Sequence, residues 1–124
     1  QPNKAATDKD YDAAIQYSVE NHIHLVCATH NEKSSVALAE LMERHGITPD
    51  SELVFFSQLF GMSDSISFNL ASAGYRVVKY VPYGPVEKVM PYLSRRASEN
   101  SSIAGQSSRE FELVRKEMKR RRLK

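Results

Sequence analysis

Hydrophobic and polar positions along this chain follow two alternating patterns. Short, unbroken apolar runs begin near His24, Leu53 and Val77, and runs of that length are typical of buried strands. Around them, apolar residues recur three and four positions apart, as on one side of an amphipathic helix. The pattern therefore predicts the order helix, strand, helix, strand, helix, strand, helix, helix.

Turn and capping residues set the expected bounds of these elements. Thr7 or Asp8 is expected to cap the first helix, and Gly46 to end the second as a C-cap glycine. Asp64 or Ser65 is expected to cap the third helix. The predicted helices are 9–21, 32–45, 65–74, 85–100 and 109–124, and the predicted strands are 23–28, 53–56 and 77–81. Residues 57–62 and 101–108 are expected to be loops.

Alternating helices and unbroken apolar strands indicate an α/β fold with a parallel sheet covered by helices. One strand–helix unit recurs about every 25 to 30 residues. A flavodoxin-like open sheet has five strands, and a complete (βα)8 barrel needs roughly 200 residues or more. Three units are too few for either. We therefore expect the carboxyl-terminal part of a larger α/β barrel over residues 1–108, followed by a basic amphipathic helix over 109–124.

Composition narrows the class of protein. The chain has 124 residues, 41% apolar and 26% charged, which suits one compact domain and excludes disorder throughout. No apolar run approaches the ~18 residues that span a bilayer, and no secretory signal is visible. The single cysteine, Cys27, excludes an internal disulfide framework and a multi-cysteine zinc site, and it fits a reducing compartment. His30 has no Cys or His at metal-binding spacing, so we expect no metal site.

Charge is unevenly distributed along the chain. Residues 109–124 hold eight basic and three acidic side chains, net +5, whereas residues 1–108 hold nine basic and twelve acidic, net −3. A basic tail can attract nucleic acid or anionic lipid. A solvated helix face is the commoner meaning of such a run, and we favour it here.

Polar side chains follow each predicted strand, where the chemistry of α/β barrels is located. After the first strand the sequence reads ATHN, and Asn31 is a good N-cap for a helix whose free amides suit an anion such as phosphate. Thr29 and Asn31 also suit plain helix capping, which the spacing alone favours. After the second strand it reads SQLFGM, where Gln58 offers both a donor and an acceptor. In KYVPYG, alternation places Tyr80 at the barrel mouth.

The segment PYLSRRASEN contains adjacent arginines, Arg95 and Arg96, with Glu99 four and three residues later. On a helix Glu99 shares a side with both, so an ion pair can hold them. Two neighbouring guanidinium groups form a fork that suits a carboxylate. The alternative is a solvated arginine pair with an ordinary helix salt bridge, and the spacing alone favours it.

Together these segments resemble the proline dehydrogenase family. The stretch YRVVKYVPYGPVEKVMPYLSRRASEN is similar to the end of its catalytic domain, and ATHN and SQLFGM occur in the same order at matching distances. The resemblance implies a distorted (βα)8 TIM-like barrel, free-standing or within a bifunctional proline utilization A protein. It implies FAD as cofactor and oxidation of L-proline to Δ1-pyrroline-5-carboxylate, with the hydride passing to the flavin and the electrons to membrane quinone.

The resemblance also assigns residues. Arg95 and Arg96 resemble the pair that clamps the proline carboxylate, and Glu99 their orienting partner. Tyr80 and Leu59 resemble walls of the proline pocket. The contacts to the adenosine-diphosphate half of FAD would come from Thr29, His30 and Asn31, and a further flavin contact from Gln58. Many relatives carry that glutamine one position earlier, where this chain has Ser57, so Ser57 and Gln58 both stay open for this contact.

The catalytic lysine and aspartate of the family lie on earlier strands that these residues do not include. Lys4 and Asp8 are not their equivalents, so we expect this chain to be inactive alone. It would pair with the upstream half of the barrel or with another copy, because its sheet has open edges. The alternatives are a hydroxyproline dehydrogenase and a non-catalytic binding module that uses the basic tail.

The expected surroundings follow from the resemblance as well. A bacterial source would place the protein in the cytoplasm, with peripheral contact to the inner membrane, and a eukaryotic source would place it in mitochondria. The expected partners are L-proline and quinone, and no nucleic acid.

Overall fold

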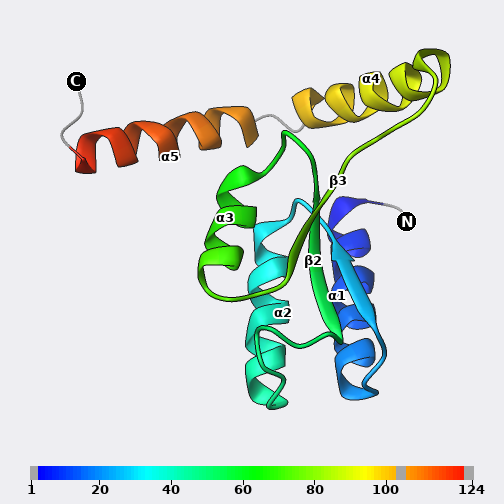
Figure 1. Ribbon diagram of the computed structural model, residues 1–124, viewed down its shortest axis with the longest axis vertical. Coiled ribbons are helices and arrows are strands. Elements are labelled where there is room, and N and C mark those ends of the chain that lie inside the picture. The colour runs from blue at the N-terminus through cyan, green and yellow to red at the C-terminus, as the bar shows by residue number, and fades with distance from the viewer. Residues whose placement is uncertain (1–2, 103–105, 122–124) are drawn as a thin grey trace. The chain divides into compact units, whose positions relative to one another are not determined.

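The computed structural model describes residues 3–102 and 106–121, with side chains described for 3–98 and 111–121 (Figure 1). Helices and strands follow one another in the predicted order. The elements are α1 (Lys4–Glu20), β1 (Leu25–Ala28), α2 (Glu32–Arg44), β2 (Val54–Leu59), α3 (Asp64–Ser72), β3 (Val77–Tyr80), α4 (Val86–Ser102) and α5 (Gln106–Arg120). The chain divides into two compact units, Gln1–Tyr80 and Val81–Lys124, and each is described by itself.

The three strands form one parallel sheet in the order β1-β2-β3, which confirms the predicted α/β class. Cys27 is aligned with Phe56, and Phe56 with Val77. Parallel strands need a crossover between them, and here α2 and α3 provide it. The strands therefore all end at the same edge of the sheet.

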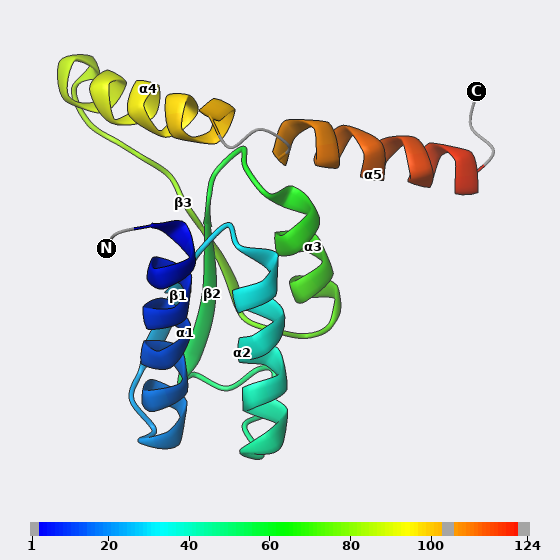
Figure 2. The same ribbon diagram turned by 180° about the vertical axis from the view of Figure 1, so that it is seen from behind.

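Helices cover one face of this sheet. α1 contacts β1 and α2, and α3 contacts β2 and β3. In Figure 2 α1 lies in front of β1, and in Figure 1, seen from the other side, β1 lies in front of α1. We call the face turned away from the helices the open face. Seven residues point toward it by alternation along the strands: Val26, Ala28, Phe55, Ser57, Leu59, Val78 and Tyr80.

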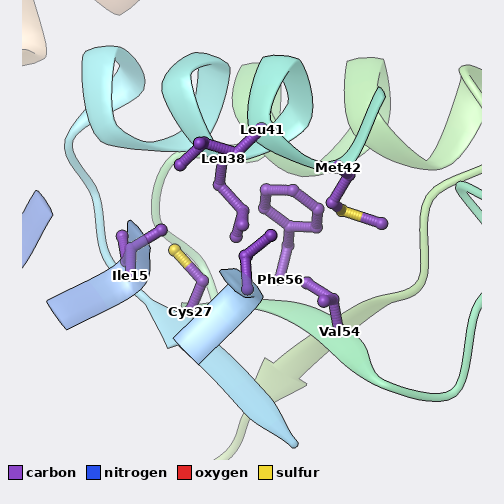
Figure 3. Close-up of a cluster of buried hydrophobic side chains, with 8 residues drawn as sticks. Ile15, Cys27, Leu38, Leu41, Met42, Val54 and Phe56 are labelled. Carbon is purple, nitrogen blue, oxygen red and sulfur yellow. The ribbon is translucent and has the colours of Figure 1, made fainter. Parts of the chain in front are cut away.

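The hydrophobic core lies between the covered face and the helices, as Figure 3 shows. Phe56 is fully buried, and its ring meets that of Tyr75 edge to face with 5.3 Å between centroids. The other buried members come from α1, α2, β1 and β2: Ile15, Val19, Cys27, Leu38, Leu41, Met42 and Val54. Each full burial of such a side chain contributes roughly 1.5–3 kcal/mol, so this cluster holds the first unit together.

Two element bounds differ from the prediction for clear physical reasons. The first helix begins at Lys4 rather than Lys9, because the Asn3 side chain accepts a hydrogen bond from Ala6 N at 2.9 Å and caps it. The second strand continues through Ser57 to Leu59, where a loop was predicted. β2 is the central strand, so ladder partners on both sides satisfy its backbone even at polar positions.

Smaller differences concern the later helices. Ser63, rather than Asp64 or Ser65, occupies the N-cap position of α3. α4 runs to Ser102 and α5 begins at Gln106, so most of the predicted loop 101–108 is helical where it is described. Residues 103–105 of that loop lie outside the described part. The boundary expected at residue 108 between barrel and tail stays a prediction.

Candidate functional site

The end of β1 is a tightly bonded turn into α2. Thr29 N donates to Ser57 O at 3.2 Å, which ties the turn to β2. The Thr29 hydroxyl accepts from Asn31 N at 3.0 Å, and the Asn31 side chain accepts from Lys33 N at 3.1 Å as the N-cap of α2. Both side chains therefore have the capping roles that the sequence suggested. A hydroxyl that accepts one hydrogen bond still has its own hydrogen to donate.

His30 joins this turn to the loop after β2. Its Nδ1 lies 2.8 Å from the Ser63 hydroxyl, and the tautomer decides which group donates. Ser63 is almost fully buried and has a left-handed backbone with φ of 51°. A non-glycine residue in that region is uncommon. The imidazole and the strained N-cap of α3 thus hold the two strand ends together.

Gln58 points to the covered face and is 2% exposed. Its amide nitrogen donates to Thr29 O at 3.3 Å, and its amide oxygen accepts from the Ser67 hydroxyl at 2.9 Å. The side chain therefore bridges the end of β1 and helix α3. Ser57, the other candidate for a flavin contact, lies on the open face.

Leu59 and Tyr80 are directly aligned neighbours on β2 and β3. Both lie on the open face at the carboxyl ends of their strands; Leu59 is 8% exposed and Tyr80 54%. Phe60 N donates to Tyr80 O at 2.9 Å and continues the pairing past the strand ends. The structure thus brings together the two residues expected to form walls of one pocket.

Lys79 was not identified as a candidate site residue from the sequence. Its side chain nevertheless joins neighbouring segments at the carboxyl ends of β2 and β3. It is aligned with Gln58 on β2. Its ammonium group donates to Met62 O at 2.7 Å and to an Asp64 carboxylate oxygen at 2.8 Å. These bonds fasten the loop after β2 to β3. The signal was present in the alternation, since a lysine at a helix-facing strand position needs a polar partner.

The arginine pair lies in α4, in the second unit. Arg95 is exposed, and Arg96 is partly buried with its guanidinium 5.5 Å from the centre of the Tyr92 ring, one turn earlier. Such a cation–π contact orients a guanidinium. Pro91 interrupts the hydrogen bonding within the same helix. The Glu99 side chain lies outside the described part of the chain.

Lys4 and Asp8, to which no catalytic role was assigned, have a local structural role. Lys4 and Asp8 form an ion pair across one turn of α1. Across residues 3–102 and 106–121, the structure shows no group of three or more His, Cys, Asp or Glu able to hold a metal ion. Within the same residues, no helix is both long and apolar enough to cross a membrane.

Comparison with known proteins adds an independent line of information. The model of the family described as "Proline dehydrogenase" matches residues 1–109. The human "Proline dehydrogenase 1, mitochondrial" is 45% identical over 125 residues, and the one from Caenorhabditis elegans is 40% identical over 126. A "Hydroxyproline dehydrogenase" from Bos taurus is 42% identical over 129 residues.

These alignments cover 97%, 96% and 99% of this chain, but only 21%, 20% and 28% of the respective relatives. The chain therefore spans between a fifth and just over a quarter of their length. No solved structure matches the chain.

Proposed function

Because the chain belongs to the proline dehydrogenase family, we propose that it supplies one wall of the active site of an enzyme that oxidises L-proline to Δ1-pyrroline-5-carboxylate. The observation that carries the proposal is the alignment of Leu59 with Tyr80, next to the turn Thr29–Asn31, at one edge of a parallel sheet. Ligands of α/β folds bind at the carboxyl ends of their strands.

The residues at this edge fit a flavin dinucleotide. The start of α2 presents a helix N-terminus, where backbone amides and the helix dipole favour phosphate. The Thr29 hydroxyl and the His30 ring stand beside it, each held by a hydrogen bond. We assign the adenosine-diphosphate half of FAD to Thr29, His30 and Asn31. Bound FAD would supply the hydride acceptor for the oxidation.

Ser57 is the better candidate than Gln58 for a contact near the flavin ring. The amide of Gln58 is buried against the helices and bonded at both ends. Ser57 is also buried, at 7% exposure, but it lies on the open face between Ala28 and Val78, its aligned neighbours, and not against the helices. In this assignment Gln58 positions the Thr29 turn rather than contacting the cofactor.

The residues that the family resemblance assigns to the substrate come from both units of the chain. Leu59 and Tyr80 would contact the proline ring, and Arg95 and Arg96 would bind its carboxylate, with Tyr92 orienting Arg96. The catalytic lysine and aspartate would come from the rest of the barrel. Electrons would pass to quinone, and a mitochondrial location follows if the chain shares that of its human and worm relatives.

A second candidate is oxidation of hydroxyproline. The hydroxyproline dehydrogenases of cattle and Xenopus laevis are 42% and 46% identical to this chain, as similar as the proline dehydrogenases. Leu59 and Tyr80 would line the wall that meets the added hydroxyl in either case. The two activities separate when kcat/KM is measured with proline and with hydroxyproline.

The arginine pair tests the proposal. A chimera carries the test: the segment of the human enzyme that aligns with this chain is replaced by this chain. Arg95→Lys or Arg96→Met is then introduced into the chimera. A charge-assisted guanidinium–carboxylate contact contributes about 1.5–3 kcal/mol. Its loss should therefore raise KM for proline, and the Kd of an unreactive cyclic carboxylate, roughly tenfold to a hundredfold.

Two controls make this result specific. Flavin absorbance should stay unchanged in both variants, because the proposed phosphate contacts lie at Thr29 and His30. Arg44→Met removes an exposed arginine from the last turn of α2 and should leave KM unchanged. If Arg95→Lys and Arg96→Met also kept the parent KM and inhibitor affinity, the arginines would be ordinary helix-surface residues and the assignment would be wrong.

A further inference from the structure

Helix α5 combines features that the proposed reaction does not use. The family match ends at residue 109, whereas α5 runs to Arg120 (orange to red in Figure 1). Phe111, Val114 and Met118 are 63%, 56% and 42% exposed. Their spacing of three and four residues places them on one side of the helix. We call these three residues the α5 stripe.

Basic side chains border the α5 stripe on both edges. Arg115 lies four residues after Phe111, and Lys119 four after Arg115, so these two follow one edge. Arg121 lies seven residues after Val114 and follows the other edge. Long basic side chains in this position can extend past an apolar surface and keep their charges outside it.

The acidic residues do not cancel this positive charge. Residues 111–121 contain five basic and two acidic side chains, which leaves a net charge of +3. Glu117 is ion-paired with Arg120 at 2.5 Å and with Arg121 at 2.6 Å. The hydrogen bonds from Arg120 and then Arg121 lower the pKa of Glu117 to about 2, so its charge is constant at neutral pH.

Three kinds of partner would account for a basic helix, and the α5 stripe discriminates among them. A coiled coil with a second copy needs apolar positions over about three to four heptads, and here the next such position is Arg121. Nucleic acid binds through phosphate contacts with cations and needs no apolar stripe. A bilayer surface with anionic lipids uses both the apolar side and the flanking cations.

We propose that α5 lies in the surface of an anionic lipid bilayer, with the α5 stripe inserted among the lipids and Arg115, Lys119 and Arg121 at the lipid head groups. The proposal rests on α5 alone and is independent of the reaction proposed above.

Vesicle flotation with the complete chain tests this proposal. Flotation separates vesicle-bound protein, which rises, from aggregates, which sediment. The chain should float with vesicles of phosphatidylcholine and phosphatidylserine and bind vesicles of phosphatidylcholine alone more weakly. Added salt should weaken the binding to anionic vesicles, because it screens the surface charge.

Substitutions in α5 give a matched comparison. Phe111→Ser should weaken binding to the anionic vesicles about tenfold, since a large apolar side chain no longer inserts. Leu113→Ser removes an apolar side chain that is 40% exposed and lies off the stripe, and it should change binding less than about twofold. Arg115→Gln should weaken binding about fivefold, the usual effect of one cation near an anionic surface.

Several outcomes would overturn the proposal. Equal effects of Phe111→Ser and Leu113→Ser would mean that the α5 stripe does not insert. Salt-sensitive binding to duplex DNA, unaffected by Phe111→Ser and without flotation, would identify a nucleic-acid partner. Self-association that Phe111→Ser abolishes, again without flotation, would identify a second copy as the partner. Met118→Ser, about two turns further along the helix, should reproduce Phe111→Ser and guards against a local folding defect.

Discussion

At the scale of single residues, the contact between Cys27 and Tyr11 links burial to the pKa values of both side chains. Cys27 is fully buried, and the Tyr11 hydroxyl donates to its sulfur at 3.6 Å. Burial raises the pKa of the Cys27 thiol, and burial together with the Cys27 contact raises that of Tyr11. Both groups therefore stay protonated in the folded chain at pH values where the unfolded chain begins to release protons.

This pair predicts a loss of stability at alkaline pH. The unfolded thiol ionises near its usual pKa of 9.0, and the folded one only above it. As pH rises past that value the unfolded state binds fewer protons than the folded state, so the free energy of unfolding falls. The slope should reach up to about 1.4 kcal/mol per pH unit for Cys27, with a further contribution from Tyr11 at higher pH.

Urea unfolding between about pH 8 and pH 10 measures this slope. Cys27→Val removes the thiol and keeps an apolar side chain, so its slope reports the other titrating groups. If the parent chain and Cys27→Val had the same slope, Cys27 would not be buried in its neutral form.

At the scale of elements, the strand ends are positioned by polar bridges between neighbouring segments. Gln58 links the Thr29 turn to α3, Lys79 links β3 to the loop before α3, and His30 bonds Ser63. Each bridge joins residues from different βα units. The candidate site is therefore held by contacts within the covered layer, on the side of the sheet opposite to Leu59 and Tyr80.

Ser67→Ala tests the Gln58 bridge. It leaves the buried amide oxygen of Gln58 without its donor, and such a loss costs about 1–3 kcal/mol of stability. Ser65→Ala in the same helix should cost less than about 0.5 kcal/mol, because that side chain is only partly buried.

A double-mutant cycle completes this test. The costs of Gln58→Met and Ser67→Ala should fail to add by about 0.5 kcal/mol or more, since the two side chains contact each other. Strictly additive costs would show that the bond contributes nothing to the folded state.

At the scale of the whole molecule, the sheet has one covered face and one open face. Val26, Val78 and Tyr80 are 59%, 41% and 54% exposed on the open face, and β1 and β3 are edge strands of the described sheet. Uncovered apolar surface and strand edges favour pairing with other chains. In a complete barrel the remaining strands would cover these groups.

The isolated chain should therefore self-associate, and sedimentation velocity measures it. Val26→Lys should weaken self-association tenfold or more, which corresponds to about 1.4 kcal/mol, because a charge opposes burial of the open face. Tyr17→Lys is the matched control: Tyr17 is 62% exposed on α1, away from the sheet, and its substitution should have little effect. A folded, monodisperse monomer would contradict the prediction.

The amino-acid sequence determined the class, the element order and the family. Periodicity sufficed for α2 with its cap Asn31, because that signal lies within one segment, and the alternating order of helices and strands sufficed for the parallel sheet. The resemblance carried by ATHN, SQLFGM and the arginine motif predicted the family that the comparison confirms. The order of the elements also predicted that polar side chains such as Thr29 and His30 lie where a strand ends, and their role at a binding site stays a prediction.

Only the tertiary structure decided which strand residues are aligned neighbours and which face of the sheet each side chain occupies. Ser57, Gln58 and Leu59 look like a loop in the sequence, and they form a strand because β2 has pairing partners on both sides. Ser57 and Gln58 were equal candidates for a ligand contact in the sequence. The register turns Gln58 toward Ser67 and Thr29, while Leu59 meets Tyr80 on the other face. Register and facing depend on contacts between segments 20 or more residues apart along the chain, such as Leu59 and Tyr80, and no local pattern encodes them.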